Sequence, residues 1–345
     1  MLLISVMAAA IWGIGAALKA PYALRGGMIG LLWLAVVALH LVLPDGHGLR
    51  QSTGGSAAPW LLLGGFAALA LVYRQGLGWA RNRAQPEPEP EKPAGTFNET
   101  ELNRYARHIV LREIGGTGQK KLKNAKVLVI GAGGLGSPAL LYLAASGVGT
   151  IGVIDDDEVD NSNLQRQVIH RDTDIGMAKV FSAKVAMEAQ NPFVEVRPYK
   201  RRLEAEMAED LFADYDLILD GTDNFVTRYL SNAAAAKLGK PLISGALSQW
   251  EGQVSVFDPA TSGPCYQCIF PEAPAPGLAP SCAEAGVIGP LPGVVGAIMA
   301  VEAIKLITGA GAPLRGEMLI YDALWGETRK IALKKRPDCP VCGGH

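Results

Sequence analysis

Lys126-Val-Leu-Val-Ile-Gly-Ala-Gly-Gly-Leu-Gly136 is the stretch that decides the fold of this 345-residue chain. Its apolar first half predicts a buried strand, and its glycines predict a tight turn into a helix over 134–146. A helix that begins at such a turn presents free N–H groups and a positive dipole end, which suit a phosphate. We therefore expect a nucleotide loop at Gly131, Gly133 and Gly134, and the loop alone leaves the kind of nucleotide open.

Short apolar strands continue to alternate with helical stretches after this loop. Strands are expected at 150–155, 194–202, 217–220 and 241–245, and helices at 176–190 and from 224 to 237. Such alternation is typical of parallel βαβ units with helices on both faces of a sheet. The last part of the chain adds expected strands at 252–257 and 318–321 and a long helix at 293–307. The predicted fold class is therefore α/β, with a Rossmann-like mixed sheet. Asp155 ends the second strand, where such a fold places a ribose-binding acid.

The apolar excess of the chain, with a mean hydropathy of +0.18, lies at its front. Three runs there, 1–18, 26–43 and 57–73, contain no Asp, Glu, Lys or Arg. A helix that spans a membrane needs about 20 apolar residues, so we predict an α-helical transmembrane anchor over 1–83. It would have three spans, or two if the first run lies in the interface. The net charge of −1 argues against a nucleic-acid partner.

Basic residues flank these runs and predict an orientation. They are Lys19 and Arg25 between the first two runs, and Arg74, Arg81 and Arg83 after the third. Because positive residues favour the cytoplasmic side, we expect a multi-pass protein of the inner membrane with everything after the third run in the cytoplasm. The next segment, 84–96, is rich in Pro and Glu, which favours an extended spacer between two domains. The second predicted domain is 97–345.

An ordered set of motifs resembles the MoeB/ThiF/HesA family, relatives of the adenylating domain of ubiquitin-activating enzymes. The motifs are Arg104-Tyr105-Ala-Arg107, the glycine loop, Ser162-Asn163-Leu164-Gln165-Arg166-Gln167, Gly176-Met-Ala-Lys179, Asp220-Gly-Thr-Asp223-Asn224, and Ser244-Gly-Ala246 followed by Glu251-Gly-Gln253. The resemblance covers about residues 97–345 and is closest to the MoeB type, the adenylyltransferases of molybdopterin synthase.

The resemblance implies an enzyme that uses ATP to adenylate the C-terminal glycine of a small ubiquitin-like sulfur carrier. The products would be an acyl-adenylate, for later thiocarboxylation, and pyrophosphate. The implied partner ends in Gly-Gly and is the small subunit of molybdopterin synthase, with the thiamine-pathway carrier as the alternative. The resemblance further implies a homodimer. The sequence does not name the carrier or the sulfur donor.

The same resemblance implies the site residues. Arg107, Arg166, Lys179 and Asp223 would be catalytic, with Arg107 reaching the neighbouring subunit. Cations stabilise the charge that develops on a phosphate, and Mg²⁺ prefers carboxylate ligands such as Asp223. The implied nucleotide-binding residues are Gly131, Gly133, Gly134, Asp155, Ser162, Asn163, Leu164, Gln165, Arg166, Lys179, Asp223 and Asn224. A structural alternative is that Asp223 caps the helix that follows it.

Four of the five cysteines form two Cys-x-x-Cys pairs, Cys265/Cys268 and Cys339/Cys342. Two such pairs suit a structural tetrahedral zinc site, and the resemblance implies the same ligands. The C-terminal tail would have to fold back as a zinc knuckle, because the pairs lie far apart in the chain. Disulfides are the alternative, and a cytoplasmic domain disfavours them. Cys282 is left over, either as a plain loop thiol or as a thioester or persulfide nucleophile.

Two functions of other classes stay open at this stage. An NAD- or FAD-dependent oxidoreductase would share the glycine loop, but it would not explain residues 162–167 or the cysteine pairs. A membrane-anchored scaffold that has lost catalysis would be expected to lack Arg166, Lys179 or Asp223, and all three are present.

Overall fold

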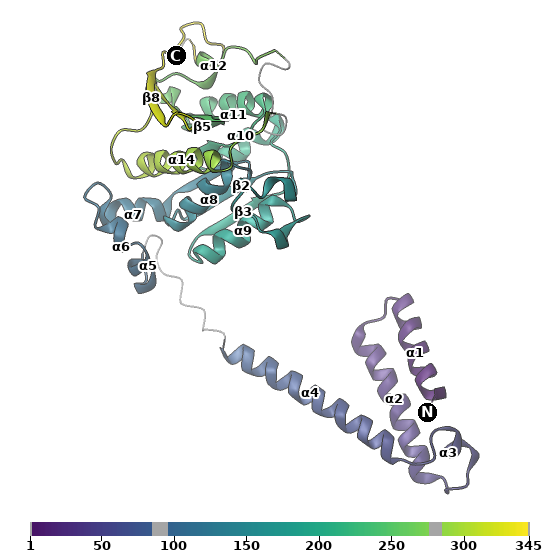
Figure 1. Cartoon of the computed structure of the whole chain (residues 1–345). Helices are drawn as coiled ribbons and strands as arrows, with labels where there is room; N and C mark the ends of the chain where they lie inside the picture. Colours follow the sequence, from purple (N-terminus) through teal and green to yellow (C-terminus); the bar gives the residue numbers. More distant parts are fainter. Residues whose placement is uncertain (1, 85–95, 276–284, 344–345) are drawn as a thin grey trace. The chain divides into compact units, whose positions relative to one another are not determined.

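The computed structural model describes residues 2–84, 96–275 and 285–343. The chain divides into two compact units, Met1–Glu91 and Lys92–His345, which are shown in Figure 1. Residues 85–95, which form most of the expected spacer, and Cys282 lie outside the described residues.

Every regular element described in the first unit is a helix. Its elements are α1 (Leu2–Ala17), α2 (Tyr22–Val42), α3 (Gly48–Ser52) and α4 (Ala58–Ala84). Both α1 and α4 pack against α2, around a small core of Ile4, Val36, Val37 and Trp60. Most other apolar side chains of these helices, such as Phe66, are exposed. By length and composition α2 and α4 could each cross a membrane, whereas α1 falls short of the length required.

Polar groups at the α2–α4 connection form hydrogen bonds with one another. The Nε2 atom of His40 lies 3.0 Å from Oγ1 of Thr53. The indole of Trp60 donates to the carbonyl of Thr53 at 3.0 Å, and the indole of Trp33 donates to the carbonyl of Trp60 at 2.7 Å. These bonds fix the turn between the two longest helices and leave their apolar surfaces facing outward.

The second unit is built on one mixed sheet of eight strands in the order β3-β2-β1-β4-β5-β6-β7-β8. The first five strands are parallel and the last three antiparallel. Their bounds are β1 (Lys126–Ile130), β2 (Thr150–Ile154), β3 (Glu195–Tyr199), β4 (Leu217–Asp220), β5 (Leu242–Leu247), β6 (Glu251–Phe257), β7 (Glu317–Asp322) and β8 (Glu327–Ala332). The expected mixed sheet is confirmed. Strand β8, at one edge of the sheet, was not expected from the sequence. All its residues are exposed, so its sequence lacks the apolar residues that mark a buried strand.

Helices cover the sheet on two faces, with a hydrophobic core under each. Val127 and Val129 of β1 belong to one core, and Leu128 and Ile130 to the other. The first face carries α8 (Gly136–Ala145), α9 (Lys179–Gln190) and α14 (Pro290–Thr308), and the second carries α10 (Ala205–Ala213), α11 (Phe225–Lys237) and α12 (Tyr266–Ile269). Three short helices precede β1, namely α5 (Glu99–Arg104), α6 (Ala106–Ile109) and α7 (Gly115–Asn124).

One helix begins later than the sequence predicts, and the expected long helix near the C-terminus has the composition of a membrane span. The helix expected from 176 begins at Lys179, because Gly176 takes a left-handed φ of +85° in the turn before it. Helix α14 has the length and composition of a membrane span, but half of it is buried. It packs against α8, β5 and β6, so it serves as a core helix of this unit.

Candidate active site

The glycine loop joins β1 to α8 at the carboxyl edge of the parallel strands. Gly131 has a φ of +92°, a conformation that other residues rarely adopt. A Cβ atom on Gly136 would lie 1.9 Å from the carbonyl oxygen of Gly131, so the loop cannot close with a larger residue there. The glycines therefore serve the tight turn that brings the backbone up to the site.

Asp155, directly after β2, holds this loop. Its Oδ2 accepts a hydrogen bond from the N–H of Ala132 at 2.7 Å, and its Oδ1 accepts one from the N–H of Asp157 at 2.8 Å. Burial raises the pKa of Asp155, and the neighbouring Lys179 and these two N–H groups oppose the rise. Each carboxylate oxygen keeps a second lone pair, which is free for a hydroxyl of a ligand.

Two cations face the same space from the chain that follows. Lys179 opens α9 as a buried side chain, with Nζ 2.7 Å from Oδ2 of Asp157. Arg166 is held by Asn163, whose Oδ1 accepts from Nη2 at 2.7 Å. The backbone carbonyl of Ser162 accepts from Nη1 of Arg166 at 3.3 Å. The motif residues before Arg166 thus orient its guanidinium.

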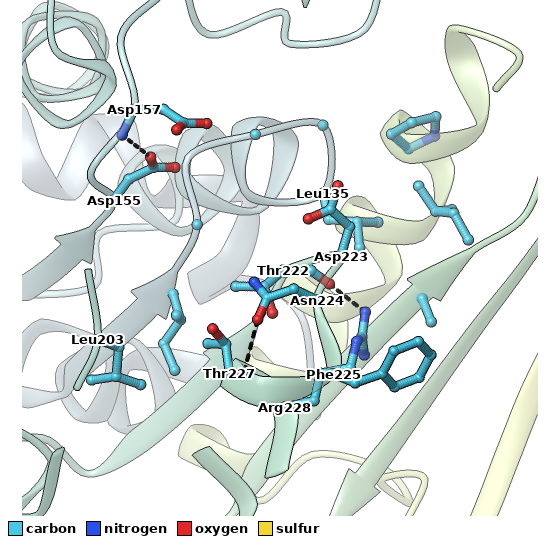
Figure 2. Close-up of a pocket in the computed structure, with 18 of the residues that line it drawn as sticks. Leu135, Asp155, Asp157, Leu203, Thr222, Asp223, Asn224, Phe225, Thr227 and Arg228 are labelled. Carbon is cyan, nitrogen blue, oxygen red and sulfur yellow. Dashed lines mark hydrogen bonds between the residues drawn. The ribbon is translucent and has the colours of Figure 1, made fainter. Parts of the chain in front are cut away.

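The loop after β4 brings Asp223 to the opposite side. Asn224 caps α11, since its Oδ1 accepts from the N–H of Thr227 at 2.8 Å. The alternative that Asp223 is the cap is therefore wrong. Within the described part of the chain the Asp223 carboxylate is exposed and makes no hydrogen bond or ion pair. Figure 2 shows Asp155 and Asp157 on one side of the site and the Asp223 loop on the other.

Arg228 fixes this loop from within the protein. It is buried, and its guanidinium donates to Oγ of Ser244 at 3.0 Å, to the carbonyl of Gly245 at 2.7 Å and to the carbonyl of Thr222. The last contact is drawn in Figure 2. One side chain of α11 therefore links the Asp223 loop to strand β5.

These elements enclose a cavity of about 590 Å³, which lies in the range of ligand pockets. Eight of the expected residues line it: Gly131, Gly133, Gly134, Asp155, Arg166, Lys179, Asp223 and Asn224. Five are not among the described lining residues: Arg107, Ser162, Asn163, Leu164 and Gln165. Arg107 lies exposed on α6, and Asn163 contributes through Arg166.

Several lining residues had no role assigned from the sequence. Gln167 stands in a motif that was identified, and its buried Oε1 has no hydrogen-bond partner among the described residues. Asp157, Leu203 and Arg228 also line the cavity. No local pattern marks these last three, because only the packing of distant segments brings them to the site.

The two Cys-x-x-Cys pairs meet in a second cluster. The four sulfur atoms are buried and lie within 4.8 Å of one another. Sulfur pairs are separated by 3.9 Å (Cys265–Cys268), 3.6 Å (Cys265–Cys339) and 3.4 Å (Cys268–Cys342). A tetrahedral Zn–S bond of about 2.3 Å implies sulfur separations of about 3.8 Å. The cysteines are free rather than disulfide-bonded, so this donor set fits zinc.

Comparison with known proteins decides the family. The ThiF family profile matches residues 105–341. The chain belongs to the ThiF family. The sulfur carrier protein adenylyltransferase of Thermus thermophilus is 51% identical over 251 residues, which are 72% of this chain and 93% of that protein. The probable adenylyltransferase/sulfurtransferase MoeZ of Mycobacterium tuberculosis is 53% identical over 256 residues, which are 73% of this chain and 65% of MoeZ.

The fold of this ThiF-family member also matches solved structures. The crystal structure of E. coli MccB aligns with a TM-score of 0.62 and 26% identity, over 73% of this chain and 75% of MccB. The family match begins at residue 105, so the helices of the first unit lie outside it.

Proposed function

We propose that this chain is a membrane-anchored adenylyltransferase that activates the C-terminal glycine of a small ubiquitin-like sulfur carrier protein with ATP. The observation that carries the proposal is the convergence of the glycine loop, Arg166, Lys179 and Asp223 on one cavity. Relatives named sulfur carrier protein adenylyltransferase and adenylyltransferase/sulfurtransferase support the substrate class. The favoured carrier is the small subunit of molybdopterin synthase, and the thiamine-pathway carrier is the alternative.

In this reaction the glycine carboxylate attacks the α-phosphorus of ATP, and the bond to the pyrophosphate oxygen breaks. Arg166 presents a planar fork that suits phosphate oxygens. Lys179 is buried, and a desolvated cation stabilises developing negative charge more strongly than an exposed one. Asp155, on the same side of the cavity as Lys179, would accept from a ribose hydroxyl.

Asp223 fits a magnesium site by its donor chemistry. Mg²⁺ is usually held by one or two carboxylates together with substrate phosphates. The exposed Asp223 carboxylate on the cavity wall has all its lone pairs available within the described chain. When bound, Mg²⁺ would neutralise charge on the phosphate oxygens.

The four clustered cysteines would hold a structural zinc ion, with no position left for substrate. Two N–H groups point at the sulfurs, from Asn232 to Cys265 at 3.6 Å and from Arg336 to Cys268 at 3.4 Å. Such donors are typical of the surroundings of metal-bound thiolates. The zinc would tie the C-terminal tail to the segment at α12.

A homodimer would complete the site with Arg107 of a second copy. In the described part of this chain Arg107 does not line the cavity. Large apolar side chains near it, on α8 and α9 and in the segment before α9 are exposed, and such surfaces commonly form interfaces. They are Val110, Leu111, Tyr142, Val168, Ile175, Phe181 and Val185.

The first unit would be the membrane anchor of an inner-membrane protein. Helices α2 and α4, with 21 and 27 residues, would be about 32 and 40 Å long. The hydrocarbon core of a bilayer is about 30 Å thick, whereas the 16 residues of α1 reach only about 24 Å. We favour two full spans with α1 in the interface. The residues after α4 would then be cytoplasmic.

The test is ATP–pyrophosphate exchange by the full chain in detergent, with each purified carrier protein in turn. We expect exchange only with a carrier that keeps its terminal Gly-Gly, and none when those glycines are deleted. Binding of a nicotinamide or flavin nucleotide without any exchange would favour the oxidoreductase alternative. A reducible adduct between Cys282 and the carrier would add a covalent step to the reaction.

A further inference from the structure

His170 lies between the glycine loop and α9, with only 6% of its surface exposed. Its Nε2 is 2.9 Å from the carbonyl oxygen of Ala132, in the middle of the glycine loop. Its Nδ1 is 2.9 Å from Oγ of Ser182 on α9. In the described structure His170 does not line the cavity, so it acts on the site only through the residues that it holds.

The partners determine where the imidazole carries its proton. A carbonyl oxygen can only accept, so Nε2 must bear the hydrogen that it donates to Ala132. The Ser182 hydroxyl donates its one hydrogen to Oδ2 of Asp174 at 2.7 Å, so it is the oxygen of Ser182 that faces Nδ1. Burial lowers the pKa of His170, and the nearby Lys179 adds to this, while Ala132, Asp155 and Asp174 oppose it. The Ala132 contact requires the hydrogen on Nε2 in either charge state of the ring.

Ala132 is therefore held from both ends. Asp155 accepts from its N–H, and His170 donates to its carbonyl. Because the peptide between Ala132 and Gly133 is planar and trans, its C=O and N–H point in opposite directions. The contact with His170 thus turns the N–H of Gly133 away from the imidazole. Gly133 lines the cavity, and its N–H has no acceptor among the described residues.

We propose that His170 is a positioning residue of the adenylation site, whose Nε2–H holds the Ala132 carbonyl so that the Gly133 N–H meets a phosphate of the nucleotide. The proposal rests on the proposed function in taking ATP as the ligand. It assigns a role to a side chain that touches no substrate, and it explains why a histidine is buried under the glycine loop.

A matched pair of substitutions separates the two sides of the ring. Glutamine places its amide nitrogen near the position of Nε2, so His170→Gln keeps a donor for Ala132. Asparagine reaches only the position of Nδ1, so His170→Asn loses that donor. We expect the Kd for ATP of the full chain in detergent to rise about tenfold in H170N and to stay within about twofold of wild type in H170Q.

Three further measurements exclude a merely structural role. In the exchange assay, H170N should raise KM for ATP and leave KM for the carrier unchanged, whereas general unfolding would reduce the active fraction without this selectivity. Ser182→Ala removes the Nδ1 partner but not the Ala132 contact, so it should bind ATP within about twofold of wild type. In the wild-type protein, nitrogen NMR should find the His170 hydrogen on Nε2.

Equal ATP affinities of H170N and H170Q would overturn the proposal, and so would an Nε2 that bears no hydrogen in the wild-type chain. The NMR measurement decides the matter even if both variants fail to fold. ATP binding by the wild type without carrier-dependent exchange would contradict the proposed function instead. The contrast between the two variants would still test His170 by ATP binding alone.

Discussion

The ammonium of Lys179 lies 2.7 Å from the carboxylate of Asp157, although the Lys179 side chain is 6% exposed and that of Asp157 is 65% exposed. An exposed acid thus serves as the counter-ion of a buried cation that faces the cavity. A bound phosphate would offer the same cation a second anion.

Asp157→Asn tests this relationship. We expect a lower thermal midpoint for the nucleotide-free variant, because Lys179 keeps its buried charge without its closest partner. ATP should then raise the midpoint more in the variant than in wild type, since the phosphates replace the missing anion. Lys179→Met is the control and should lose most of the ATP effect. Equal shifts in wild type and D157N would contradict this account.

Asp223→Asn should reduce the kcat of exchange by about 10²–10³, a usual range for the loss of one electrostatic contact to the transition state. The thermal midpoint should stay near that of wild type, because the carboxylate has no partner in the described chain. The matched control is Asn224→Ala, which removes the cap of α11 and should cost about 1 kcal/mol of stability. Normal exchange by D223N would exclude Asp223 from catalysis.

The cysteine cluster should carry one zinc ion per chain when the purified protein is analysed by elemental mass spectrometry. Cys268→Ser should lower both the zinc content and the thermal midpoint, because structural zinc binding contributes directly to folding. Cys282→Ser should leave the zinc content unchanged. A full wild-type activity in protein free of zinc, at an unchanged midpoint, would show that the metal is not structural.

Protonation of His170 should make the stability of the protein depend on pH. Burial lowers its folded pKa below the ordinary value of 6.5, so the unfolded chain takes up a proton first as the pH falls. The contribution of the neutral His170 ring to the free energy of unfolding is complete above pH 6.5. It is lost as the pH falls towards the folded pKa. The slope is at most about 1.4 kcal/mol per pH unit for one group. Unfolding midpoints of H170Q should fall less steeply than those of wild type, and parallel curves would contradict the assignment.

The proposed topology has its own test. A reporter that is active only in the cytoplasm, fused after Arg83, should be active in the full-length context. A second reporter, fused in the connection between α2 and α4, should be active only in the periplasm. An inactive Arg83 fusion, together with activity of the same cytoplasmic reporter in the α2–α4 connection, would reverse the orientation and place the nucleotide site on the side that lacks ATP.

The sequence predicted the features that depend on short-range pattern. The glycine loop, the parallel strands and the two Cys-x-x-Cys pairs are each encoded within a few residues. Strand boundaries were predicted to within a few residues because most residues of β1, β2 and β4 are buried and apolar. Strand β8 was missed for the opposite reason, since all its residues are exposed.

Residue roles that depend on distant contacts could not be predicted from the sequence. Asp223 and Asn224 are both plausible helix caps by residue type. Only the folded backbone shows that Asn224, and not Asp223, accepts the hydrogen bond from the N–H of Thr227. Arg228 had no assigned role because Ser244 and Gly245, which it binds, lie on another strand.

The sequence by itself therefore determined the fold class, the glycine loop and the four cysteines, because local backbone sterics and residue chemistry impose these patterns. Only the tertiary structure decided which polar groups share the cavity and which of them already have partners. Hydrogen bonds such as that between His170 and Ala132 join segments 38 residues apart. Their strength depends on burial and direction, which the folded chain alone supplies.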